Sequence, residues 1–216
     1  PQSDADYGFT TAPTASKSFK DEVQECLEQK FGSDVERKNK SIKVHGNTYR
    51  KDADTVPSLR YRDYSGDYRK DASNYVGGIV IFPDDNTGAI INYPEQHIYN
   101  GRQKNVSTHH HYKKMVRILK KMRYLMQEYY YSEADKVSSF ALESLLWNVP
   151  DDYYLENGQY RKVFLFSRLI SYLRSHYDDF DGYFEANGIK KLFPSETDKK
   201  NMIAFIEQLA VFYTYE

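Results

Sequence analysis

The 216-residue sequence has little cysteine, no long hydrophobic run and almost no net charge. Its one cysteine, Cys26, cannot form an internal disulfide, so we expect a reducing, cytoplasmic setting. No apolar run approaches the ~18 residues of a membrane-spanning helix, and the polar start from Pro1 to Asp6 is not that of a signal peptide. The balance of 30 basic against 31 acidic residues excludes a globally basic nucleic-acid coat protein.

Tyrosine, by contrast, is abundant, at 21 of the 216 residues. Aromatic side chains carry much of the apolar area that a core buries, which argues against a disordered chain. The length suits one large domain or two small ones. No run of Gly, Ser or Pro marks a linker, so we expect one continuous body.

The first part of the chain, residues 1–105, has a mixed pattern. A leader without periodicity precedes a predicted helix that starts near Ser18 and ends at Gly32. Alternating residues predict strands over 42–44 and over 49–61, and Pro57 ends or edges the second of them. Two further runs flank a turn-forming segment and predict a hairpin; they are 76–82 and 89–92.

Apolar spacings of three and four dominate residues 106–216 and predict helices. The predicted helices run from 108 to 130, from about 135 to Pro150, from 159 to 177 and from 197 to 213.

Two aspartates, Asp52 and Asp54, lie two residues apart just before Pro57. Alternate residues of a strand point to the same face, so the two carboxylates could together bind Mg²⁺ or Mn²⁺, which prefer oxygen ligands. Surface aspartates with the same spacing are common, and the spacing alone does not separate the two interpretations.

Cations crowd the predicted long helix, and three of them, Lys113, Arg117 and Lys120, recur at helical spacing. Such a face could hold phosphates, or it could be an ordinary solvated face balanced by nearby acidic residues. Ser138 and Ser139 open the next helix, where hydroxyls and free N–H groups either bind an anion or cap the helix.

Several strings of the sequence, taken in order, resemble one known family, the bacterial nucleotidyltransferases similar to cyclic GMP-AMP synthase and oligoadenylate synthase (CD-NTases). The resemblance covers roughly Phe19 to Pro150. It rests on FGSDVERKNKSIKV, NTYRKDADTVPSLRYRDY, GGIVIFPDD, IINYPEQHIYNGRQKN, KKMVRILKKMR and SSFALESLLWNVP.

The resemblance implies an α+β fold, with a partial nucleotidyltransferase palm over 1–105 and an all-helical lobe over 106–216. The palm would combine a mixed or antiparallel sheet with a helix. Enzymes of this family join NTPs such as ATP and GTP into cyclic or linear oligonucleotide second messengers, which in bacteria act as anti-phage signals. The resemblance implies that the full enzyme makes a cyclic di- or trinucleotide. Three palm carboxylates and two Mg²⁺ (or Mn²⁺) ions polarise the attacking hydroxyl and stabilise the leaving pyrophosphate.

The resemblance also implies roles for individual residues. Asp54 takes the position of the third carboxylate, as a catalytic residue and metal ligand, while Asp52 would be solvated or supporting. Lys120 and Ser139 match residues that hold the donor triphosphate. Phe140 falls where an aromatic ring can stack on a base.

The family's Gly-Ser motif and first carboxylate pair precede its first helix, and this sequence does not contain them. Asp4 and Asp6 have the spacing of that pair, but the residues after them lack a strand pattern. We therefore expect the chain to be the C-terminal three quarters of such an enzyme and to be inactive alone. A sheet without its first strands has an open edge, which predicts association through that edge or with a missing N-terminal segment.

Two other interpretations stay open on the sequence. The chain could be a nucleotide- or partner-binding module without catalysis, or a purely structural interaction domain. Binding of ATP or GTP separates the first from the second. Neither composition nor motifs indicate a membrane or nucleic-acid partner.

Overall fold

A computed structural model of the chain describes residues 15–64, 70–71, 73–155 and 162–213. The chain divides into two compact units, Pro1–Tyr93 and Pro94–Glu216. Asp4, Asp6 and the leader up to residue 14 lie outside the described residues.

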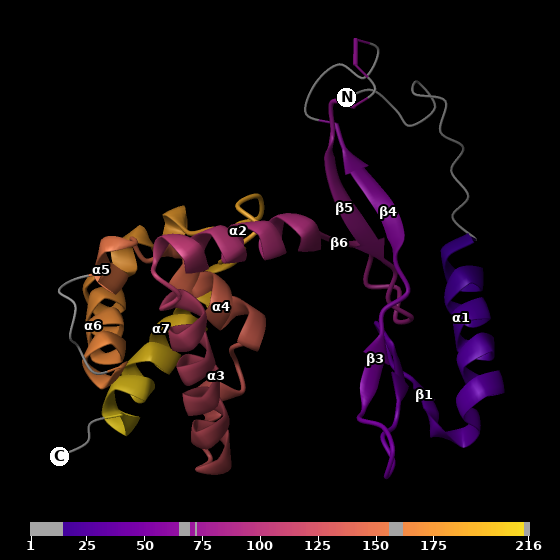
Figure 1. Cartoon of the computed structure of the whole chain (residues 1–216), viewed down its shortest axis with the longest axis horizontal. Helices are drawn as coiled ribbons and strands as arrows, with labels where there is room; N and C mark the ends of the chain where they lie inside the picture. The colour runs from indigo at the N-terminus through magenta and orange to yellow at the C-terminus, as the bar shows by residue number, and fades with distance from the viewer. Residues whose placement is uncertain (1–14, 65–69, 72, 156–161, 214–216) are drawn as a thin grey trace. The chain divides into compact units, whose positions relative to one another are not determined.

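The first unit contains one long helix, α1 (Ala15–Phe31), and two three-stranded antiparallel sheets (Figure 1). A short 3₁₀ turn, η2 (Gly32–Asp34), follows α1. One sheet has the order β1-β2-β3 and the other β4-β5-β6. The strands are β1 (Val35–Arg37), β2 (Ile42–Val44), β3 (Ala53–Thr55), β4 (Leu59–Asp63), β5 (Val76–Ile81) and β6 (Ile90–Asn92).

These elements confirm the predicted helix, the strand over 42–44 and the hairpin. Helix α1 ends where Gly32 adopts a positive φ of 59°, a left-handed conformation that glycine takes without strain. The predicted strand over 49–61 is wrong as a single element, because β3 and β4 belong to different sheets. Pro57 lies between them and cannot donate a backbone hydrogen bond to a sheet.

A buried cation ties α1 to the turn between β5 and β6. Lys20 is only 4% exposed, and its Nζ donates to the Asp84 carboxylate at 2.9 Å and to the carbonyls of Lys38 and Asn39. Arg37, from β1, donates to both oxygens of Asp84 at 2.7 and 2.9 Å. These contacts lower the pKa of Asp84 to about 2. The hydrogen bonds from Arg37 have the largest effect, and Lys20 adds to it.

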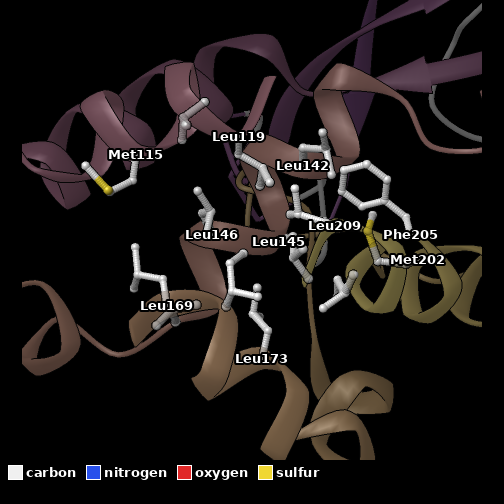
Figure 2. Close-up of a cluster of buried hydrophobic side chains, with 14 of the residues drawn as sticks. Met115, Leu119, Leu142, Leu145, Leu146, Leu169, Leu173, Met202, Phe205 and Leu209 are labelled. Atoms are coloured by element: carbon white, nitrogen blue, oxygen red, sulfur yellow. The ribbon is translucent and has the colours of Figure 1, made fainter. Parts of the chain in front are cut away.

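The second unit is helical. Figure 2 shows leucine, methionine and phenylalanine side chains from several of its helices meeting in one core, among them Leu119, Leu145, Leu169 and Phe205. No helix among the described residues is long and apolar enough to cross a membrane. The helices are α2 (Pro94–Ser107), α3 (Tyr112–Glu128), α4 (Ser139–Asn148), α5 (Asp152–Leu155), α6 (Lys162–Ser175) and α7 (Glu196–Phe212), with 3₁₀ turns η3 (Ser132–Ala134) and η4 (Tyr177–Gly182).

Helix α2 was not predicted, and the sequence-based boundary at residue 105 falls inside it. The reason is that α2 has no buried apolar stripe: Ile98, Tyr99 and Val106 are each more than half exposed. Its buried residue is Gly101, which faces the ring of Tyr112. The α+β class itself is confirmed.

Candidate functional site

Three of the candidate residues lie on two helices of the second unit: Lys120 on α3, and Ser139 and Phe140 on α4. The buried residues of α3, such as Met115, Leu119 and Met126, recur at helical spacing and fix which face of the helix meets the core. Lys120 follows Leu119 at the edge of that stripe, so its side chain is only 28% exposed. A long cationic side chain in this position buries its stem and presents its ammonium group.

Lys120 forms an ion pair with Glu143, from α4. The Lys120 Nζ donates to one Glu143 carboxylate oxygen at 2.7 Å, and the other oxygen lies 3.5 Å from His97 Nε2, on α2. His97 and Lys120 stabilise the charged carboxylate against the opposing effect of burial and hold the pKa of Glu143 at about 2. Glu143 is therefore ionised at neutral pH.

The two serines at the start of α4 have different roles. Ser138 is the N-cap residue, and its Oγ accepts a hydrogen bond from the Ala141 backbone N–H at 3.0 Å. Ser139 is the first residue of the helix, and its Oγ lies 3.4 Å from the hydroxyl of Tyr124, which α3 supplies one turn after Lys120.

Replacing Ser138 with alanine should lower the free energy of unfolding by about 1 kcal/mol, the usual cost of losing an N-cap hydrogen bond. Urea unfolding followed by circular dichroism measures the change. Ser139→Ala is the matched control, because the Ser139 hydroxyl caps no backbone N–H in the described contacts. Equal losses in the two variants would contradict the capping role.

Phe140 is 45% exposed, although it lies in the first turn of a helix whose later residues are buried. The imidazole of His97 stacks against the Phe140 ring, with centroids 4.9 Å apart and an angle of 23° between the planes. The ring is thus held by His97 while much of its surface remains accessible.

Two other cations of α3, Arg123 and Arg117, donate to backbone carbonyl groups. Arg123 donates its Nε to the carbonyls of Ala134 and Val137 at 2.9 and 2.7 Å, which anchors the segment before α4. Arg117 donates to the Lys113 carbonyl one turn earlier.

Asp54, in the first unit, lies exposed on β3 and pairs in register with Lys43 on β2. Asp52 has a different environment. It forms an ion pair with Lys43 at 2.7 Å and accepts a hydrogen bond from the Gly46 N–H, and both contacts lower the pKa of Asp52. The two aspartates therefore differ in their surroundings.

The described residues do not by themselves fit a magnesium site. Within them, no group of three or more His, Cys, Asp or Glu side chains is placed to hold a metal ion. Asp54 offers one carboxylate, whereas Mg²⁺ requires near-octahedral coordination by oxygen.

Sequence reasoning missed Glu143, His97 and Tyr124. One signal was present for the first: Glu143 is the one charged residue of α4, and it follows Ser139 by one helical turn. His97 carried no such signal, because α2 itself was not predicted.

Comparison with known proteins identifies the class. The family model described as "cGAS/DncV-like nucleotidyltransferase C-terminal helical domain" matches residues 99–214. The chain therefore belongs to the cGAS/DncV-like nucleotidyltransferase family, and the resemblance drawn from its sequence is confirmed.

Among curated relatives, the cyclic GMP-AMP synthase CdnE03 of Staphylococcus schleiferi is 42% identical over 97% of this chain. The cyclic dipyrimidine nucleotide synthase CdnE of Legionella pneumophila is 38% identical over 86%. The matches span 64% and 60% of those two proteins, so this chain covers less than two thirds of their length.

Solved structures agree with the fold. The CdnE cyclic dinucleotide synthase of Elizabethkingia meningoseptica, solved with GTP and Apcpp, matches with a TM-score of 0.80 and 32% identity. The match covers 98% of this chain and 75% of that one. The c-UMP-AMP synthase CdnE of Rhodothermus marinus, solved with Apcpp and Upnpp, gives a TM-score of 0.79 at 28% identity, over 99% of this chain and 72% of that one.

Proposed function

We propose that this chain is part of a nucleotidyltransferase that joins NTPs into a cyclic oligonucleotide second messenger, and that it does so in the bacterial cytoplasm as an anti-phage signal. The observation that carries the proposal is the grouping of Lys120, Ser139 and Phe140 on α3 and α4. The relatives support it, since all those named above are cyclic nucleotide synthases.

In the proposed site, Lys120 and Ser139 hold the triphosphate. A lysine ammonium is a compact charge with three donors, and one hydroxyl adds a further donor for a phosphate oxygen. Phe140 stacks on the base with the part of its ring that His97 leaves accessible.

Enzymes of this family use divalent metal ions. We propose Asp54 as the residue of this chain that contributes a ligand to Mg²⁺ or Mn²⁺. Because one carboxylate does not make the site, the chain as given is expected to bind NTPs without turning them over.

A nucleotide-binding module without catalysis is the second candidate. It is favoured for this stretch of chain because the described residues contain no group of three or more side chains placed to hold a metal ion. Association with another chain or segment through the edge of a sheet is proposed on a separate observation: each described sheet has only three strands and therefore two edges, β1 with β3 and β4 with β6.

The test compares the protein encoded by the whole gene with this 216-residue chain. With Mg²⁺ and the four NTPs, chromatography should detect a cyclic product from the former, and calorimetry should detect NTP binding by both. Binding without any product from the whole-gene protein would favour the non-catalytic module. Absence of both binding and product would leave only a structural role and refute the proposal.

A further inference from the structure

Three helices of the second unit meet at one carboxylate, that of Glu143. Its own helix is α4, its first oxygen accepts from Lys120 of α3 at 2.7 Å, and its second lies 3.5 Å from His97 of α2. The backbone carbonyl of Glu143 also accepts a hydrogen bond from the hydroxyl of buried Tyr112 at 3.0 Å. These contacts fix both the side chain and the backbone at this position.

Both partners of the Glu143 carboxylate belong to the proposed nucleotide site: Lys120 is itself a proposed phosphate contact, and His97 packs against Phe140, the proposed base contact. The Lys120 ammonium uses one donor on Glu143 and keeps two for a phosphate. The His97 ring, only 16% exposed at its side chain, backs the ring of Phe140. One carboxylate therefore links the phosphate-binding group to the base-stacking group.

We propose that Glu143 is a positioning residue for nucleotide binding: it holds the Lys120 ammonium and the His97–Phe140 stack in the arrangement that one NTP requires. This role rests on the proposed function of the same site. It assigns to Glu143 no contact with the nucleotide itself.

A positioning role and a purely electrostatic effect of Glu143 predict opposite changes in NTP affinity when its charge is removed. A carboxylate near a phosphate site repels the anion, so removing its charge should tighten binding if charge alone mattered. A lysine side chain, however, loses conformational entropy when it is held in one rotamer. If the free protein already holds the lysine in place, ligand binding does not have to order it, and the affinity is higher. Because the Glu143 carboxylate pairs with the Lys120 ammonium at 2.7 Å, its charge is compensated, and we expect the ordering of the Lys120 side chain to outweigh the repulsion between carboxylate and phosphate.

Calorimetry with ATP, GTP, CTP and UTP on the full chain tests this role. For the NTP that binds most tightly, Glu143→Gln should weaken binding on the order of fivefold to tenfold, which lies in the upper part of the range for one ordinary hydrogen bond, because the amide oxygen can still accept from Lys120 without the charge. In the Lys120→Ala background the same change should cost much less, because the group that it orders is absent. Unchanged or tighter binding in Glu143→Gln, or fully additive losses, would overturn the role.

Two further variants keep the test decisive. Glu143→Asp retains the charge but withdraws it from Lys120 by one methylene, so it should also weaken binding even if Glu143→Gln does not fold. Glu207→Gln is the matched control, since Glu207 pairs with Arg174 at 2.8 Å on α6 and α7 and should leave binding unchanged. Absence of NTP binding by the unmodified chain would refute the proposed function and this role together, whereas wild-type binding with unaffected Glu143 variants would refute this role alone.

Discussion

Replacing Asp54 with asparagine in the protein encoded by the whole gene should lower the rate of cyclic nucleotide synthesis on the order of a thousandfold. Asparagine keeps the size of the side chain but removes the negative charge with which a carboxylate attracts a divalent ion. A metal ion contributes several kcal/mol of transition-state stabilisation, and each ~1.4 kcal/mol corresponds to a factor of ten. Product formation at saturating Mg²⁺ and NTP measures the loss.

Asp52→Asn provides the matched control, two residues away on the same stretch of chain. Asp52 already pairs with Lys43 and the Gly46 N–H, so its change should leave the rate within a few-fold of the original. NTP affinity should be retained in Asp54→Asn, because Lys120 and Ser139 are unaltered. If both variants kept full activity, Asp54 would not be the catalytic carboxylate.

Asp84→Ala should lower the free energy of unfolding by about 3 kcal/mol, the low end of the range for breaking a buried ion pair. The variant leaves the ammonium of Lys20 buried with only two carbonyl partners. It also removes the two Asp84 acceptors of Arg37, which keeps its hydrogen bonds to Asp21 and Gln24. The low end applies because the Asp84 side chain is 31% exposed. Denaturant unfolding followed by circular dichroism measures the change.

The same contact predicts a pH dependence. The folded pKa of Asp84 is about 2, below its ordinary value of 3.8, so its contribution is fully present above about pH 5. That contribution, about 2 kcal/mol, is lost as the pH falls through 4 toward 2. Asp84→Ala should lack this part of the acid sensitivity, and Asp85→Ala, its exposed neighbour, should retain it. An identical acid profile in all three proteins would contradict the assignment.

The sequence was informative where local pattern and tertiary structure agree. The spacing of Met115, Leu119 and Met126 predicted α3, because the same periodicity that makes a helix amphipathic determines which residues the core buries. The hairpin β5–β6 was predicted for a similar reason, since its turn residues have local conformational preferences.

The rest depended on contacts between distant residues. Helix α2 buries a glycine instead of an apolar stripe, so no periodicity marked it. Lys120 could be proposed from the family resemblance, but its pairing with Glu143, 23 positions later, could not be read from either residue alone. The separation of β3 from β4 likewise followed from sheet pairing, which local strand propensity does not specify.

Cys26 gives the first unit a built-in site for a spectroscopic label. It is the chain's one cysteine, and its side chain is exposed on α1, about two turns after Lys20. A maleimide fluorophore will therefore attach at a single known position without any prior mutagenesis. Because Lys20 and Asp84 join α1 to the β5–β6 turn, the anisotropy of that dye should report separation of the helix from the turn directly, in real time and at nanomolar protein concentration.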